Sequence, residues 1–178
     1  MKILFELLEI IILRRRPRDI SYNVSAAAIA FMITIAATYI SAVAINVFTQ
    51  PFLFVITQGL LQTIIFYLLL VITKKKNRFI QTITALFGIS AILQLLGFVI
   101  LVLPALGILG LAITSWNFYL MIVILREAID CKTLQSVIIT ILYHFLMGLI
   151  LLMLFPDVYE RMQAIVEAAE ATKESVTH

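Results

Sequence analysis

Long apolar runs, separated by short polar or charged segments, make up most of the chain. Five of these runs contain no Lys, Arg, Asp or Glu and reach the roughly 20 residues that an α-helix needs to cross a bilayer. They lack the period-2 alternation of apolar and polar residues that is typical of membrane β-strands. The pattern predicts five transmembrane helices, at residues 22–47, 51–73, 79–103, 104–125 and 134–155.

The connections between these runs are short, which favours antiparallel neighbouring helices. Pro51 and Pro104 mark two of the breaks, because proline disfavours helical backbone in the residue before it. At Pro104 an alternative stays open, in which residues 79–125 form one kinked or re-entrant segment. We expect an all-α membrane protein, a five-transmembrane-helix bundle over residues 22–155 with short amphipathic interfacial helices at both ends.

The two flanking segments have a different pattern. In residues 1–21 an apolar stretch too short to span carries Lys2, Glu6 and Glu9 on one helical face, which predicts a helix on the inner leaflet. In residues 156–178 apolar positions recur every three or four residues, which predicts a second amphipathic helix on the outer side of the membrane.

Composition agrees with membrane insertion. Of the 178 residues, 63% are hydrophobic and 13% are charged, whereas soluble domains are about half apolar and a quarter charged. A water-soluble fold is therefore excluded. The single cysteine, Cys131, forms neither an internal disulfide nor a metal site by itself.

The basic residues indicate how the bundle is oriented. They cluster before the first span and between the second and third, while the connections on the opposite side carry no charge. The positive-inside rule predicts a multi-pass protein of a bacterial inner membrane, with its N-terminus cytoplasmic and its C-terminus extracytoplasmic. The positions of these clusters indicate membrane topology and not nucleic-acid binding. We expect the clusters to contact anionic lipid headgroups. Their members are Arg14, Arg15, Arg16, Arg18, Lys74, Lys75, Lys76 and Arg78.

Small residues recur at four-residue spacing along the first span. Such a stripe lets another helix approach closely, and its threonines can form hydrogen bonds across the contact. Packing inside the bundle is one interpretation, and a homo-oligomer or membrane-protein partner is the other. The stripe consists of Ala26, Ala30, Thr34, Thr38 and Ala42.

Each span carries at least one polar side chain near its middle. A neutral amide or imidazole is costly in hydrocarbon without a partner, so these groups should point inward. They act either as interhelical hydrogen-bond partners or as the lining of a polar pocket or substrate path. The candidate midplane site consists of Thr34, Gln62, Gln94, Ser115, Asn117 and His144, with Gln58, Ser90 and Thr114 at similar depth.

His144 is the only ionisable side chain, apart from Tyr and Cys, within a predicted span. An intramembrane ionisable group indicates function by default. No span contains Asp or Glu, which argues against proton coupling. We expect a core histidine bonded to Asn117 or a glutamine, and the alternative hypothesis is that His144 binds or gates a ligand.

Catalytic and cofactor motifs are missing. The chain has no paired carboxylates, HExxH or CxxC motif, or Ser, His and Asp set. We expect no catalytic residue, metal or cofactor, and an intramembrane enzyme ranks below every other hypothesis.

Several short segments resemble the Yip family of small polytopic membrane proteins, in its shorter bacterial form. The resemblance rests on TALFG at 84–88, LLGF at 95–98, PALG at 104–107, SWN at 115–117, ILREA at 124–128 and RP at 16–17. It implies five spans and a cytosolic N-terminus. Eukaryotic members are linked to Rab GTPases through an N-terminal Tyr-Gly-Pro motif, which this chain lacks, so Rab binding is not carried over.

Two functional hypotheses follow. The first is a non-catalytic scaffold or accessory subunit that associates through helix faces such as the small-residue stripe. The second is a small transporter, channel or lipid-binding protein that uses the polar midplane site. A dry, closed bundle favours the first hypothesis, and a polar cavity open to one side favours the second.

Overall fold

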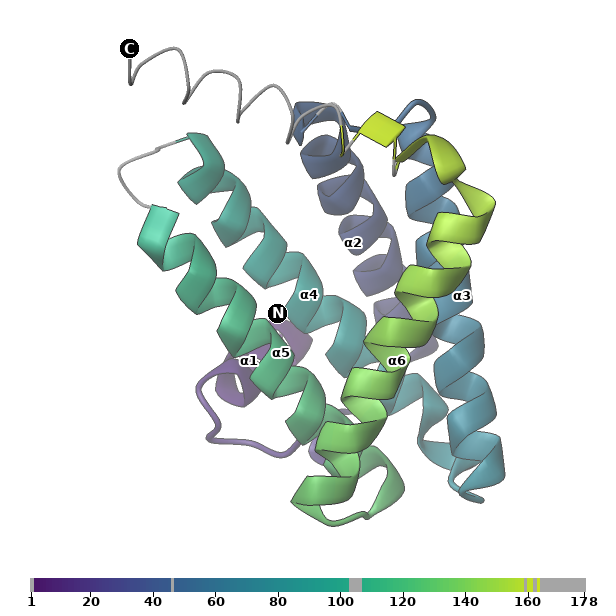
Figure 1. Ribbon diagram of the computed structural model, residues 1–178. Helices are drawn as coiled ribbons and strands as arrows, with labels where there is room; N and C mark the ends of the chain where they lie inside the picture. The colour runs from purple at the N-terminus through teal and green to yellow at the C-terminus, as the bar shows by residue number, and fades with distance from the viewer. Residues whose placement is uncertain (1, 46, 103–106, 159, 162, 164–178) are drawn as a thin grey trace, which may run out of the picture.

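The computed structural model describes residues 2–45, 47–102, 107–158, 160, 161 and 163, and within them it contains helices but no strand (Figure 1). The helices are α1 (Lys2–Ile11), α2 (Val24–Ile45), α3 (Pro51–Ile72), α4 (Phe79–Val102), α5 (Gly107–Ile129) and α6 (Thr133–Leu154). Two short 3-10 helices, η1 (Pro17–Asp19) and η2 (Lys76–Arg78), lie in the connections.

Helices α2 to α6 are each long and apolar enough to cross a membrane. This confirms the predicted fold class, a bundle of five helices of membrane-spanning length, and the protein is a multi-pass helical membrane protein. Helix α5 continues to Ile129, beyond the predicted end at Leu125. The helix accommodates Arg126 in its last turn, where a cation complements the partial negative charge of the helix end.

Helix α4 is the centre of the bundle. It contacts α1, α2, α3, α5 and η1, and its most extensive contact is with α2 (Figure 1). Residues 82–89 of α4 form an unbroken buried stretch. The predicted break at residues 103–106, between α4 and α5, lies outside the described residues.

The N-terminal helix α1 docks against the bundle. Leu7 and Ile10 are buried in the main hydrophobic core, and Leu7 packs directly over Gly88 of α4. Trp116 of α5 donates its indole N–H to the carbonyl oxygen of Ile11, at 3.1 Å. Glu6 faces inward, whereas Phe5 is 63% exposed. The expectation of one polar face therefore fails at Glu6, because its carboxylate finds partners inside the protein.

One end of the bundle, called here the basic end, carries the α3–α4 and α5–α6 connections. Asp130 accepts hydrogen bonds from Lys75 Nζ at 2.6 Å and pairs with Arg78 at 2.9 Å. The N-terminal segment joins through Arg18, which lies 3.4 Å from Glu127. Hydrogen bonds from Arg78 and Lys75, together with their charges, hold the pKa of Asp130 well below its usual range.

At the opposite end, the hydroxyl of Thr49 donates a hydrogen bond to the carboxylate of Asp157. The predicted amphipathic tail, residues 156–178, falls largely on positions outside the described residues, and that includes Met162, Ile165 and Ala169 of its apolar pattern.

Candidate functional site

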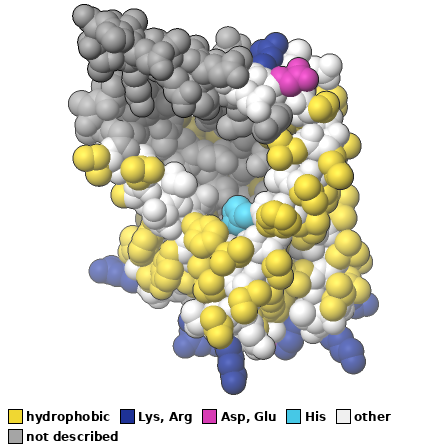
Figure 2. Space-filling view, in the orientation of Figure 1, with side chains coloured by type: hydrophobic (Ala, Val, Ile, Leu, Met, Phe, Trp, Pro, Cys, Tyr) yellow, Lys and Arg dark blue, Asp and Glu magenta, His cyan; other side chains and the backbone are white. Residues whose placement is uncertain are grey.

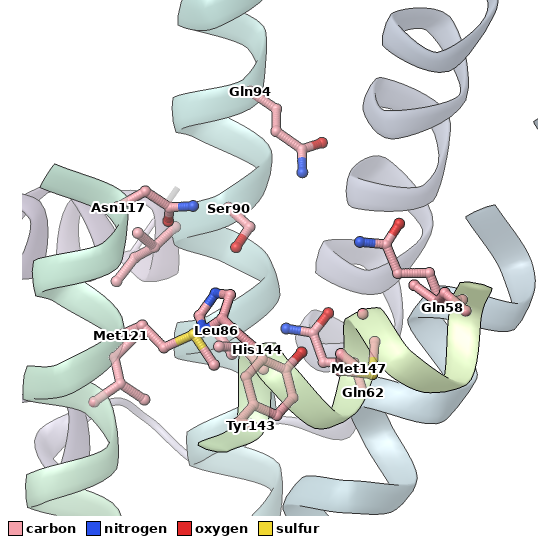
Figure 3. A pocket seen from close by; sticks show the side chains of 14 residues that line it. Gln58, Gln62, Leu86, Ser90, Gln94, Asn117, Met121, Tyr143, His144 and Met147 are labelled. Atoms are coloured by element: carbon pink, nitrogen blue, oxygen red, sulfur yellow. The ribbon is translucent and has the colours of Figure 1, made fainter. Parts of the chain in front are cut away.

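A cavity of about 300 Å³ lies between α3, α4, α5 and α6 (Figure 3). We call it the central cavity. Its apolar lining includes Leu86, Met121 and Met147. Its polar lining consists of Gln58, Gln62, Ser90, Gln94, Asn117, Tyr143 and His144.

The polar lining lies halfway along the helices. Gln62, Ser90, Asn117 and His144 are each within one residue of the midpoint of their helix. Residues four positions apart share a helix face, so Gln58 joins Gln62 on α3 and Ser90 joins Gln94 on α4. Helical periodicity and helix packing together therefore bring side chains from four helices to one level of the bundle.

Most of these side chains have no hydrogen-bond partner in the protein. Among the described residues, the side chains of Gln58, Gln62, Ser90 and Asn117 form no hydrogen bond. The side chains do not point at one another closely enough to pair, and Figure 3 shows them spread around the cavity wall. The interpretation that the polar side chains form hydrogen bonds between helices therefore does not describe these four residues.

Two threonines of α2 are bonded across to α4 near this level. The hydroxyl of Thr38 donates to Gln94 Oε1 at 2.7 Å. The hydroxyl of Thr34 lies 2.6 Å from the carbonyl oxygen of Phe87. Gln94 keeps its amide N–H groups free, and Figure 3 shows its nitrogen turned toward Ser90 and the cavity.

His144 is held by its own helix. Its Nδ1 lies 2.8 Å from the carbonyl oxygen of Thr140, and not against Asn117 or a glutamine as expected. Because a carbonyl oxygen only accepts, Nδ1 carries a proton, and in the neutral tautomer with that proton Nε2 is an acceptor. The rings of Phe118 and Tyr143 lie 5.3 and 5.1 Å from the imidazole, measured between centroids, and restrict its orientation.

The central cavity opens to one face of the molecule. Figure 2 shows the imidazole of His144 in a hollow on the face formed by α5 and α6. In Figure 1 these two helices lie together near the basic end and diverge toward the other end. The cavity is therefore polar and open, whereas a dry bundle would have closed this level.

Two further cavities share amide-bearing residues with the central cavity. One of about 40 Å³ lies between α2, α3 and α4 and shares Gln58, Gln62, Ser90 and Gln94 with it. Another of about 310 Å³, between α2, α4 and α5, shares Gln94 and Asn117 and includes Ser41 and Thr114. The shared residues make a polar band that crosses the bundle.

The structure brings four of the six predicted midplane residues to the central cavity: Gln62, Gln94, Asn117 and His144. Thr34 is buried at the α2–α4 contact and borders only the small cavity. Ser115 is exposed and lines none of the three cavities, so the structure does not bring it together with the other predicted residues. Ser115 lies at the predicted depth in the helix, but on a different face of α5 from Asn117.

Tyr143 belongs to the lining and was not predicted. A tyrosine in an apolar run reads as an ordinary core or interfacial residue, because most of its surface is apolar. The one available signal was its place beside His144.

The small-residue stripe packs inside the bundle. Ala30, Thr34 and Ala42 are buried, Ala26 and Thr38 are partly buried, and the two threonines contact α4 through the bonds given above. This is the geometry of the intramolecular alternative.

The predicted headgroup-binding residues divide into two groups. Arg15, Arg18, Lys75 and Arg78 form ion pairs with acidic side chains of the protein. Among the described residues, the remaining four form no ion pair and are exposed. They are Arg14, Arg16, Lys74 and Lys76.

A buried carboxylate near the N-terminus was missed by sequence reasoning. Glu6 is 2% exposed and accepts hydrogen bonds from Ser21 N at 3.0 Å and Ser21 Oγ at 2.8 Å. Arg15 lies 3.2 Å away. Burial opposes ionisation of Glu6, but the bonds from Ser21 and the charge of Arg15 outweigh it and lower its pKa.

Metal-ligating residues do not gather anywhere in the described part of the chain. Cys131 is partly buried, and burial raises the pKa of its thiol. No family model matches the chain, and neither a curated protein nor a solved structure matches it, so the resemblance to the Yip family has no support from these comparisons.

Proposed function

We propose that this membrane protein binds a membrane-soluble molecule whose uncharged polar group occupies the central cavity. The observation that carries the proposal is the set of unpaired polar side chains, Gln58, Gln62, Ser90 and Asn117, around an open cavity at mid-helix depth. These four residues are partly buried, and their unpaired polar atoms face the cavity and not a protein partner. Three amides and one hydroxyl left unpaired at one level are explained by a ligand, or by water that a ligand displaces.

Helix packing alone would not require these residues. Leucine or alanine at the same positions would close the bundle without leaving polar groups unpaired. Real proteins break such packing rules mainly at functional sites. The polar lining is thus better explained by binding than by structure.

The scaffold hypothesis depended on a helix face that is free to bind a partner. The small-residue stripe is engaged with α4, so a partner would have to use another surface. We therefore favour a binding or carrier role, of the class of small transporters and lipid-binding proteins, over a scaffold or accessory subunit.

We propose that this role is non-catalytic and that the basic end faces the cytoplasm of a bacterial inner membrane. The polar groups at the cavity are amides, hydroxyls and one imidazole, which suit recognition. Arg14, Arg16, Lys74 and Lys76 are free to contact anionic headgroups, as the positive-inside orientation requires.

The test compares two substitutions on the same helix. Native mass spectrometry of protein extracted gently from its membrane should detect a retained molecule in the wild type. Asn117→Leu should lose it, with retention at least about tenfold lower, because the cavity loses a hydrogen-bonding group. Ser115→Leu, two residues away and outside the cavity, should retain it as the wild type does. Equal retention by both variants, or no retained molecule in the wild type, would contradict the proposal.

A further inference from the structure

We propose that the group recognised in the central cavity is an uncharged group with several hydroxyls, such as a glycerol or sugar headgroup. This inference rests on the proposed function and adds the chemical class of the ligand. It is argued from the charge, the hydrogen-bonding roles and the size of the cavity.

Charge excludes the common phospholipid headgroups. The residues that line the central cavity include no Lys, Arg, Asp or Glu. A phosphate or an ammonium group placed there would lose its hydration without gaining an opposite charge, which is strongly unfavourable. Lys74, Lys75, Lys76 and Arg78, which could pair with phosphate, lie at the basic end, away from the mid-helix level.

Hydrogen-bonding roles require a donor on the ligand. In the neutral imidazole of His144 with its proton on Nδ1, toward the carbonyl oxygen of Thr140, Nε2 is an acceptor, and no described residue donates to it. A ligand group that offers only acceptors, such as an ester or a ketone, would leave Nε2 unpaired. An O–H group on the ligand satisfies it.

The other side of the cavity requires an acceptor on the same ligand. Gln94 already receives a hydrogen bond from Thr38 at its Oε1, so its free Nε2 is left to donate. Gln58, Gln62 and Asn117 each present one free carbonyl and one free NH₂ group. Neighbouring hydroxyls donate and accept at once, and thus match a ring of side-chain amides.

The volume of the central cavity and its opening to one face are suitable for a lipid headgroup. About 300 Å³ is at the small end of the range for ligand cavities, about 300–1,000 Å³, so it suits a single polar headgroup and not a whole lipid. Figure 2 shows hydrophobic side chains beside the hollow, so a hydrocarbon chain attached to the headgroup could leave through it. A free polyol would satisfy the same lining, so the two sources must be separated by experiment.

The experiment uses purified full-length protein in lauryldimethylamine oxide, a detergent without hydroxyls, because glycoside detergents would compete. Binding is measured by native mass spectrometry with dioleoylglycerol and a monoglycosyl dioleoylglycerol. Dioleoylphosphatidylglycerol is the charged control and also carries glycerol hydroxyls. Free glycerol and free hexose are the soluble controls.

We expect a neutral hydroxylated lipid to bind in a 1:1 complex, and phosphatidylglycerol to bind at least about tenfold more weakly. The methyl ether of dioleoylglycerol, which has no hydroxyl donor, should also bind at least about tenfold more weakly, since Nε2 would stay unpaired. His144→Leu should remove this discrimination, and His144→Gln, which restores an acceptor, should recover part of it. The ether comparison uses the wild type and does not depend on how well a variant folds.

The outcomes separate the inference from the proposed function. Equal binding of the alcohol and its methyl ether, or preference for phosphatidylglycerol, would overturn the hydroxyl class. If none of these probes binds while the membrane extract still yields a molecule lost on Asn117→Leu, the inference fails and the proposed function stands. Binding of free hexose or glycerol, with lipids excluded, would keep the hydroxyl class and make the source soluble.

Discussion

At the scale of the residue, polar side chains at the same depth behave in two ways. Thr34 and Thr38 use their hydroxyls across the α2–α4 contact, whereas Gln62 and Asn117 pair with no described residue. The threonines are short, and their hydroxyls lie close to a neighbouring helix. The amides extend into space that no other side chain fills. Substitution by an apolar residue should therefore have opposite effects on stability in the two groups.

We predict that Thr38→Val lowers the free energy of unfolding by about 0.6 kcal/mol, the average for interhelical hydrogen bonds in membranes. Asn117→Leu should leave it unchanged or raise it, because an unpaired amide is replaced by a group that packs. Thermal unfolding in detergent, without added ligand, measures both. A drop in the melting temperature on Asn117→Leu as large as on Thr38→Val would show that Asn117 has a structural role.

At the scale of the element, α1 is the clearest case of a helix placed by specific contacts. Leu7 fits over Gly88, where a Cβ atom would come within 2.5 Å of Leu7 Cδ1. Trp116 binds the carbonyl of Ile11 at the end of the helix. Glu6 ties the helix to Ser21, close to the start of α2. These contacts predict that α1 stays docked to the bundle and does not move freely in the interface.

We predict that Glu6→Ala weakens the docking of α1 by about 1–3 kcal/mol, because Ser21 and Arg15 lose a charged acceptor. Amide hydrogen-exchange protection of α1 at pH 7 measures the loss. Glu9→Ala is the matched control and should have little effect, since Glu9 is exposed and contacts Arg15 only at 3.4 Å. Equal protection in the Glu6 variant and the wild type would contradict the prediction.

The same contact makes α1 sensitive to acid. The pKa of Glu6 is lowered in the folded protein, so its contribution is present above the unfolded value of about 4.3. It should be lost as the pH falls below that value and through the folded pKa. The difference in α1 protection between wild type and Glu6→Ala should therefore shrink as the pH is lowered, and a difference that grows would contradict this assignment.

At the scale of the whole molecule, packing differs between the two halves of the bundle. Toward the basic end, residues 82–89 of α4 are all buried, and the connections are tied by Asp130 to Lys75 and Arg78. Away from that end, Asn117 and Gln94 border both larger cavities. The central cavity should therefore be more accessible from the half of the bundle away from the basic end, where α5 and α6 diverge.

Cysteine accessibility tests this asymmetry. Cys131→Ser provides a background without cysteine. In that background we predict that Asn117→Cys and Thr114→Cys react with a membrane-impermeant maleimide from the end opposite the basic end, at least about tenfold faster than buried Thr84→Cys. Native Cys131 in the wild type identifies the basic end of each vesicle preparation. Faster labelling of Asn117→Cys from the basic end would contradict the prediction.

The sequence by itself determined the five membrane-spanning helices, because length, apolar composition and missing charge are properties of each segment alone. It also determined the depth of the polar residues, since depth follows from distance to the helix ends. It could not separate Ser115 from Asn117, which differ only in the direction that each faces once α5 is rotated against its neighbours. Nor could it predict that Glu6 would be buried, because its partners Ser21 and Arg15 meet it only when the chain turns back after α1.

Tertiary structure alone decided whether the polar layer is closed or open. Amides at one level can form hydrogen bonds to one another only where helix packing brings them within reach. The divergence of α5 and α6 left the amides around a cavity, and the small-residue stripe went to the α2–α4 contact. These outcomes depend on the relative rotation and tilt of helices, which hydrophobic patterns do not encode when helices are apolar on all sides.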